Sequence, residues 1–510
     1  MASRTHDLPP LQGANLVVGT IVLSLASFMT VLDTSIANVA IPAISGDLGV
    51  SPTQGTWVIT SFAVATAIMM PLTGWLTQRI GQVRLFVGST LLFTLASLLC
   101  GLATNIESLI LFRILQGAVA GPMIPLSQSL LLASYPKARA GFALSMWGMT
   151  SLVAPVCGPI FGGVITDNIA WSWIFYINVP VGLLSALITW RLYRDRETPT
   201  RRLPIDRVGL ALLVIWVGAT QVMLEKGKEL DWFASGQVIV LGAVALVGFI
   251  LFIIWELTDE HPIIDLSLFT DRNFLIGTIA VSIGYGVFFA NVVLLPLWLQ
   301  QWMGYNATWA GLVSAPVGIL AILVSPLVGK YMTVFDTRKI VTVAFIGFAA
   351  VLWMRSQFNT QADPQTILLP ILLQGLFMPT FFIPMLALTV TNLPQSRVPA
   401  ATGLTNFIRL TAGAVGTSIT TTTWENRAAI HHAHISERLT QDNLAFTDAM
   451  AELEQQGFSR EQGLAYFNRL VDQQAFTLSV DEIFLMSAVL FALMIPLIWI
   501  ARPVSDSPAQ

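Results

Sequence analysis

The chain has 510 residues, of which 55% are hydrophobic and only 11% are charged, and its formal net charge is −3. Soluble domains carry about 25% charged residues, so this composition excludes an ordinary soluble domain, and the lack of a basic stripe excludes a nucleic-acid-binding surface. The two cysteines, Cys100 and Cys157, lie inside apolar runs without a metal-ligand spacing. They are therefore expected to be packed thiols, and no metal is expected there.

Fourteen apolar runs divide the chain, and their lengths suit helices that cross roughly 30 Å of hydrocarbon. They cover approximately residues 15–42, 54–76, 84–104, 106–133, 141–164, 173–193, 207–224, 236–256, 274–301, 306–328, 340–358, 366–392, 399–424 and 482–501. A transmembrane β-barrel would show short alternating segments instead. The sequence therefore predicts an all-α polytopic membrane protein, and the even number of spans puts both termini on one side.

The distribution of Lys and Arg predicts which side that is. If the N-terminus is cytoplasmic, 17 of the 24 basic residues outside the spans fall in cytoplasmic connections. The short outer connections then hold only Lys226, Lys228 and Arg355, and the long outer segment is exempt because long loops escape the positive-inside rule. The first apolar run is also too long for the h-region of a signal peptide. We therefore expect a retained first span and cytoplasmic termini.

The outer segment 425–481 is the one long polar stretch. Its apolar residues recur at helical spacing, which predicts amphipathic helices. Its histidine cluster, His431, His432 and His434, leaves open either a metal site or a solvated polar turn. No acidic or cysteine ligand is closely spaced with the cluster, which favours the turn.

Two residues of opposite charge lie inside spans, where a charge costs at least about 2.5–3.5 kcal/mol. Asp33 is about nine residues from the outer end of the first span, and Arg113 is about seven residues into the fourth, so at about 1.5 Å per residue both lie roughly 10–13 Å below the outer surface. We expect them to pair if these spans are neighbours. Burial and a neighbouring arginine act on the proton affinity of an aspartate in opposite directions, which suits a proton-coupling acid. The alternative is a static ion pair.

A third intramembrane charge, Arg409, lies in the middle of the thirteenth span close to Asn406. It is a candidate for binding an anionic group, for pairing with a helix carbonyl or for gating. Four acidic residues at span ends are expected to be solvated, namely Glu107, Glu225, Glu256 and Glu482.

The connection between the second and third spans resembles the signature loop of the major facilitator superfamily. In the segment GWLTQRIGQVR, which begins at position 74, Gln78 stands where the family has an acidic residue. The matching residues are Gly74, Leu76, Arg79 and Gly81.

Three further spans resemble signatures of the same superfamily. LILFRILQGAVAG, from position 109, resembles the signature of span 4, and GPIFGG, from position 158, resembles the antiporter signature of span 5. LDTSIANVAIP, from position 32, resembles the first span of the fourteen-span drug:proton antiporters. Further along, WSWIFYINVP and LEKGKELDW also resemble segments of that branch. The matching residues are Asp33, Asn38, Pro42, Arg113, Gln116, Gly117, Gly158, Pro159, Gly162 and Gly163.

This resemblance covers nearly the whole chain, and the long outer segment before the last span looks like that of the EmrB-type drug exporters. It implies an N-terminal six-helix bundle at 1–193, a linker with two additional transmembrane helices at 194–273, and a C-terminal six-helix bundle at 274–510 that includes the periplasmic loop 425–481. It also implies the bacterial inner membrane, an EmrA-type periplasmic adaptor, an outer-membrane channel, and no cofactor.

The expected function is proton-driven export of hydrophobic or amphiphilic drugs. Asp33 and Arg113 are the expected proton-coupling pair. The motif residues expected to serve conformational change are Gly74, Arg79, Gly81, Gly158, Pro159, Gly162 and Gly163. Candidates for substrate binding or gating are Asn38, Gln116, Asn406 and Arg409. One rival keeps the fold and exports a natural metabolite or siderophore. A membrane enzyme or sensor is disfavoured, because the sequence shows no HExxH, GxSxG or phosphate-loop motif and no long cytoplasmic segment.

Overall fold

The computed structural model describes residues 10–136, 139–201, 204–332, 334–437, 439 and 443–502. Within these ranges a few side chains, that of Pro159 among them, lie outside the description. The described residues form α-helices and short 3-10 helices, without strands. This agrees with the all-α prediction.

The helices of the first half are α1 (Gly13–Asp47), α2 (Pro52–Gly55), α3 (Trp57–Met69), α4 (Thr73–Ile80), α5 (Gln82–Gly101), α6 (Ile106–Ser134), α7 (Ala140–Asn168), α8 (Trp173–Tyr176) and α9 (Asn178–Tyr193). Two inserted helices follow, α10 (Arg207–Lys226) and α11 (Gly236–Thr258). The second half contains α12 (Arg272–Gln301), α13 (Ala307–Ser314), α14 (Pro316–Tyr331), α15 (Thr337–Arg355), α16 (Pro364–Leu388), α17 (Val398–Ser436), α18 (Leu444–Gln455), α19 (Arg460–Leu493) and α20 (Ile495–Trp499).

Polar N-caps fix where several long helices begin. Asn105 accepts a hydrogen bond from the backbone N–H of Ser108 at the start of α6, and Asp206 and Asp271 do the same for α10 and α12. Such caps satisfy backbone donors that the first helical turn leaves free. They therefore mark the points at which the apolar helices begin.

Among the described residues, eleven helices are long and apolar enough to cross a membrane, or twelve if the pair α3 and α4, bent by 63°, forms one broken span. Each of the fourteen predicted spans corresponds to a helix or to consecutive helices. The spans predicted at 141–164 and 399–424 fall in α7 and α17, which are not among those counted. Helix α4 continues to Ile80, whereas the sequence predicted that the span ends near residue 76 and is followed by a connecting loop.

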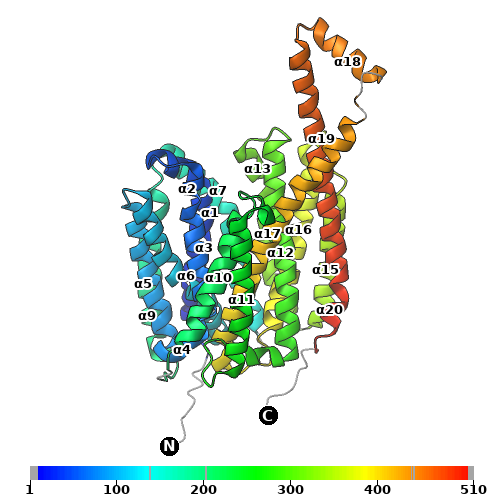
Figure 1. Ribbon diagram of the computed structural model, residues 1–510. Helices are drawn as coiled ribbons and strands as arrows, with labels where there is room; N and C mark the ends of the chain where they lie inside the picture. The colour runs from blue at the N-terminus through cyan, green and yellow to red at the C-terminus, as the bar shows by residue number, and fades with distance from the viewer. Residues whose placement is uncertain are drawn as a thin grey trace, which may run out of the picture.

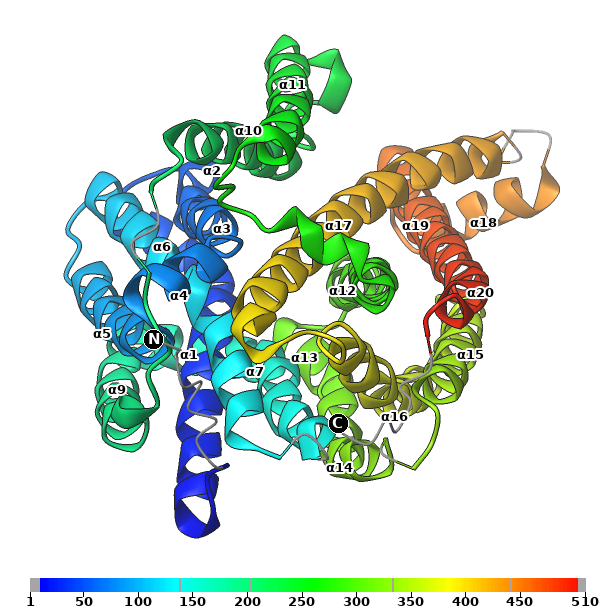
Figure 2. The same ribbon diagram turned by 90° about the horizontal axis from the view of Figure 1, so that it is seen from below.

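The helices form two bundles that lie side by side, α1 to α9 in one and α12 to α20 in the other (Figure 1; Figure 2). The inserted helices lie on one side of the molecule, where α10 packs against α3 and α17 while α11 packs on α10 (Figure 2). Helix α1 begins and α20 ends on the same face (Figure 1), which we call the terminal face; the opposite one is the distal face.

Beyond the distal face, α18 and the adjoining ends of α17 and α19 project away from the bundles (Figure 1). The prediction of helices within 425–481 is thus confirmed, but the boundaries are different. Helix α17 continues to Ser436 and α19 already begins at Arg460, so the polar segment consists largely of extensions of membrane helices. A capping box at Ser459 fixes the start of α19.

Candidate functional site

Asp33 of α1 and Arg113 of α6 form a buried ion pair. Nη1 of Arg113 lies 2.5 Å from Oδ2 of Asp33. Asp33 is 2% exposed and Arg113 is 0% exposed, so water does not reach either group in this conformation. The structure therefore brings together the two charges that the sequence placed at one depth.

Two side-chain amides and one hydroxyl group form a hydrogen-bond network around this pair. Asn178, the first residue of α9, donates to Oδ1 of Asp33 at 2.8 Å and to Ser97 Oγ at 3.0 Å. Gln116 donates to the same aspartate oxygen at 3.1 Å and accepts from Arg113 at 2.7 Å. A buried ion pair holds together only when its remaining polar atoms are also satisfied, and this network supplies most of those bonds.

Close helix packing places these side chains against one another. A Cβ at Gly117 would collide with the carbonyl oxygen of Phe62, and a Cβ at Gly158 would collide with Ser35. Glycine at these positions lets α6 approach α3 and lets α7 approach α1. Gly162 makes a looser approach to Ile36, whereas nothing lies within 4 Å of a Cβ built on Gly163.

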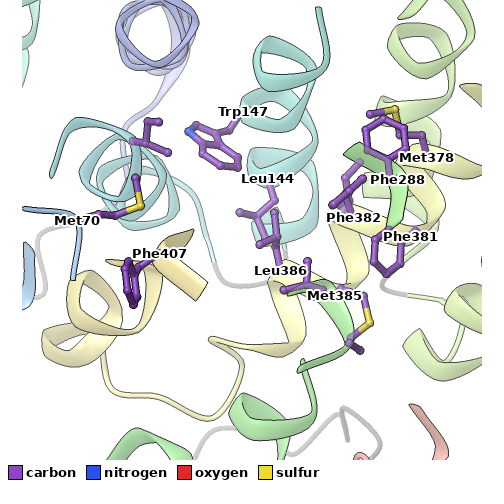
Figure 3. Packing of buried hydrophobic residues seen from close by; sticks show 14 of the residues in the cluster. Met70, Leu144, Trp147, Phe288, Met378, Phe381, Phe382, Met385, Leu386 and Phe407 are labelled. Carbon is purple, nitrogen blue, oxygen red and sulfur yellow. The ribbon is translucent and has the colours of Figure 1, made fainter. Parts of the chain in front are cut away.

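A cavity of about 500 Å³ lies between the two bundles. Helices of both bundles and the inserted α10 line it, and the lining is mainly apolar, with Trp147, Phe288 and Phe382 among the larger side chains. Figure 3 shows part of this lining, including Leu144 of α7 and Leu386 of α16. Volume and lining are those of a site for a small organic molecule.

The two bundles meet on the terminal side of the cavity. Asn406 of α17 donates to Oε1 of Gln128 in α6 at 3.0 Å, and Thr402 donates to the carbonyl oxygen of Pro125 at 3.3 Å. Nearer the terminal face, a Cβ on Gly74 would overlap Ala400 of α17. The cavity reaches the distal halves of α10 and α17, so this conformation is closed toward the terminal face.

Phe62 of α3 connects the ion pair with the cavity lining. The guanidinium carbon of Arg113 lies 4.1 Å from the centre of the Phe62 ring, and Phe62 also lines the cavity. A molecule that moves this ring therefore changes the surroundings of Arg113 directly.

The remaining candidates for substrate binding or gating divide into two groups. Asn38 and Arg409 line the cavity. Gln116 is fully buried in the ion-pair network and is not part of the cavity lining. Asn406 is fully buried where the bundles meet. Spacing along one helix could not separate these environments, because they depend on which helices surround each face.

At the terminal face, Gly81 adopts a positive φ of 98° between α4 and α5, a conformation that favours glycine. Its neighbours Val83 and Arg84 donate their backbone N–H groups to Glu197 at 3.0 and 2.9 Å. Glu197 thus binds the N-terminus of α5, an acidic contact that the sequence analysis missed. The guanidinium carbon of Arg79 lies 5.2 Å from the ring centre of Trp75.

Two other expectations about polar groups were wrong. Glu256 was expected to be solvated but is 4% exposed and accepts a hydrogen bond from the backbone N–H of Ile264 at 3.0 Å. The histidines at 431, 432 and 434 lie in α17 rather than in a turn. His431 lies 3.1 Å from Glu482, and within the described chain no group of three or more ligand-type residues could hold a metal ion.

Asn178 is the main site residue that sequence reasoning missed. The motif WSWIFYINVP contains it, and an amide within a long apolar run was the available signal. Its partner could not be read from the sequence, because Asn178 lies 145 positions from Asp33 along the chain.

Comparison with known proteins now decides the family. The model of the Major Facilitator Superfamily matches residues 23–417. The chain belongs to this superfamily. It is 50% identical to the fatty acid resistance protein FarB of Neisseria gonorrhoeae, over 98% of each chain, and 50% identical to the multidrug export protein EmrB of Escherichia coli K12, over 97% of each chain.

The fold agrees with this assignment. The crystal structure of human MFSD10 superposes with a TM-score of 0.60 at 11% identity, covering 96% of this chain and 100% of the other. The protein is therefore a multi-span membrane transporter of the EmrB-type branch, as the sequence motifs indicated.

Proposed function

We propose that this transporter is a proton-driven antiporter that exports hydrophobic or amphiphilic compounds, drugs among them, from the cytoplasm. The observation that carries the proposal is the buried Asp33–Arg113 pair beside an apolar cavity, with the Phe62 ring both in contact with Arg113 and part of the cavity lining. The printed names of the two relatives, one for multidrug export and one for fatty acid resistance, support a lipophilic cargo.

Protonation of Asp33 can drive a conformational change. When a proton binds the Asp33 carboxylate, the attraction to Arg113 weakens, and the hydrogen bonds from Asn178 and Gln116 lose their charged acceptor. The contacts among α1, α6 and α9 then favour a different arrangement. Cargo that enters from the cytoplasm favours the return of Asp33 to its charged state and releases the proton.

The two bundles rock about the cavity during this cycle, as in other transporters built from repeated halves. The contacts of Asn406 with Gln128 and of Thr402 with Pro125 must open when the terminal side becomes accessible. Each proton that enters contributes about 2.3 kcal/mol per 100 mV of membrane potential and about 1.36 kcal/mol per unit of pH difference.

The proposed location is the bacterial inner membrane, with both termini in the cytoplasm. The excess of Lys and Arg in connections on the terminal side supports this orientation. The distal projection formed by α17, α18 and α19 then lies in the periplasm, where an EmrA-type adaptor and an outer-membrane channel would continue the export path. The likeness to EmrB supports such partners.

Proton release from purified protein tests the coupling role. In weakly buffered detergent solution, lipophilic compounds should cause the wild-type protein to release protons, and Asp33→Asn should abolish this release while the variant remains folded. Asp47→Asn is a matched control, since Asp47 lies at the distal end of the same helix and accepts a hydrogen bond from Trp171. Normal release from the Asp33→Asn variant would contradict the mechanism.

A second candidate cargo is a natural metabolite or siderophore. Arg409 in the cavity favours this alternative for acidic compounds of these kinds, because it supplies a cation to their acid group. Export of an endogenous acid by wild-type cells, without protection against lipophilic drugs, would favour it over drug export.

A further inference from the structure

Arg409 is a buried cation without a carboxylate partner in the described part of the chain. It is 7% exposed, and its Nη2 donates to Oδ1 of Asn406 at 2.8 Å. Its Nε is buried and has no hydrogen-bond partner among the described residues. Because an unpaired buried guanidinium is costly, this arrangement provides a donor for an anion that arrives in the cavity.

The hydroxyl groups of Thr411 and Thr417 also line the cavity on α17, and both are buried without a hydrogen-bond partner in the described structure. Together with Arg409 they add polar groups of α17 to an otherwise apolar lining, and α17 contributes no acidic side chain to it.

An aromatic cluster adjoins Arg409. The guanidinium carbon lies 4.6 Å from the ring centre of Tyr285, which stacks on Phe289 at 5.5 Å and meets Phe382 edge-on at 5.8 Å. All three rings line the cavity. A flat or extended apolar group bound there would lie beside the cation, so the site offers one charged end and one apolar end.

Close packing of two helices fixes this geometry. A Cβ on Gly413 would lie 2.9 Å from the Tyr285 ring, and a Cβ on Gly286 would lie 2.7 Å from the carbonyl oxygen of Ala412. Glycine at both positions therefore lets α12 approach α17. The cation and the aromatic cluster are held together by the fold and do not need a ligand to assemble them.

The other charges of the cavity lining do not duplicate Arg409. Lys228 is paired with Glu425 at 2.7 Å, and Glu225 is an acid near the distal end of α10. An anionic headgroup is therefore attracted to Arg409 and repelled from the position of Glu225.

We propose that Arg409 forms a subsite for the carboxylate of an amphiphilic acid, whose apolar part rests on Tyr285, Phe289 and Phe382. The inference rests on the proposed export function and specifies the class of cargo. A guanidinium binds a carboxylate through charge-assisted hydrogen bonds, which are stronger than neutral ones. Acids should therefore bind more tightly than neutral compounds of the same shape.

The test compares 1-pyrenebutyrate with 1-pyrenebutanol, which share the ring system and chain but differ in charge. Binding is measured by pyrene fluorescence on the full chain in lipid nanodiscs, with empty nanodiscs as the background. Wild type should bind the acid about tenfold more tightly than the alcohol, as expected for a hydrogen bond to a charged group. Arg409→Gln should remove this preference, and Arg409→Lys should keep part of it.

Lys228→Gln is the matched control, because it removes a cation of the same cavity that already has a carboxylate partner. It should leave the preference unchanged. Retained binding of the alcohol by Arg409→Gln shows that this variant is folded. An unchanged preference for the acid in Arg409→Gln, or no preference in wild type, would overturn the anion subsite alone. Failure of wild type to bind either compound would overturn the proposed lipophilic cargo as well.

Discussion

The two bundles share one local packing arrangement of their helices but differ in the charged residues that lie within it. Both contain a Gln-Gly step at which the glycine approaches a neighbouring helix: Gly117 approaches the carbonyl oxygen of Phe62, and Gly375 approaches that of Val317. Both glutamines also contact the end of the preceding helix. Gln116 accepts a weak bond from Cys100 at 3.6 Å, whereas Gln374 accepts a hydrogen bond from the guanidinium of Arg355.

Only the N-terminal bundle adds a carboxylate to this arrangement. Asp33 pairs with Arg113, whereas Arg355 is 2% exposed, lies 5.8 Å from the Phe484 ring and forms no ion pair within the described chain. A carboxylate has a protonated and an ionised form, whereas an arginine is not deprotonated in proteins. The comparison indicates that proton exchange belongs to one half of the molecule, while the other half carries a permanently charged counterpart.

The largest expected effect comes from breaking the pair in the N-terminal bundle. Arg113→Met leaves the Asp33 carboxyl buried without its partner and should lower the free energy of unfolding by about 3–5 kcal/mol. The double variant Asp33→Leu/Arg113→Met should recover part of that loss, because no uncompensated charge remains. Thermal unfolding followed by tryptophan fluorescence measures both, and simple additivity of the two substitutions would show that the groups do not interact.

A smaller effect, of opposite sign, is expected in the C-terminal bundle. Replacing Arg355 by Met together with Gln374→Leu removes a buried cation and its acceptor at once. Replacing both partners of a buried hydrogen bond by apolar groups can be nearly neutral or stabilising, so we expect a stabilisation of about 1 kcal/mol at most. Cargo-driven proton release should persist in this variant. A folded variant that had lost proton release would show that the C-terminal bundle takes part in proton exchange. It would contradict the assignment of proton exchange to the N-terminal bundle alone.

A similarly small effect concerns a partly exposed ion pair of the C-terminal bundle at the terminal face. Hydrogen bonds from Arg338 lower the pKa of the Asp336 carboxyl, which also caps α15, below its ordinary value of 3.8. A lowered pKa stabilises the fold above the unfolded-state value and loses that contribution as the pH falls through the folded-state value. Asp336→Ala should therefore cost about 1 kcal/mol at neutral pH.

Unfolding temperatures of wild type and Asp336→Ala, compared between pH 7 and the lowest pH at which wild type stays folded, measure this contribution. The difference should shrink once the pH is below about 4. A difference that stays constant over the whole range would assign the effect to capping geometry and not to charge. Proton coupling should be unchanged throughout, which separates a structural charge pair from the pair at Asp33.

The sequence by itself determined the membrane class, the approximate spans and the depth of Asp33 and Arg113. Apolar run length measures bilayer thickness directly, and a fixed rise per residue converts position into depth. The helix boundaries predicted from the sequence were wrong where polar residues continue a helix beyond its apolar run, as in α17 and α19. Helix formation there does not depend on apolar composition.

Only the tertiary structure decided which polar groups meet. Asn178 reaches Asp33 from a helix far along the chain, Gln116 turns into the ion-pair network and away from the cavity, and Arg409 faces the cavity beside Tyr285. Apolar residues that line a cavity and apolar residues that pack helices look alike in a sequence, since both satisfy the same hydrophobic requirement. The packing of α1, α3, α6, α12 and α17 against one another distinguishes them, and that packing depends on contacts between residues distant in sequence.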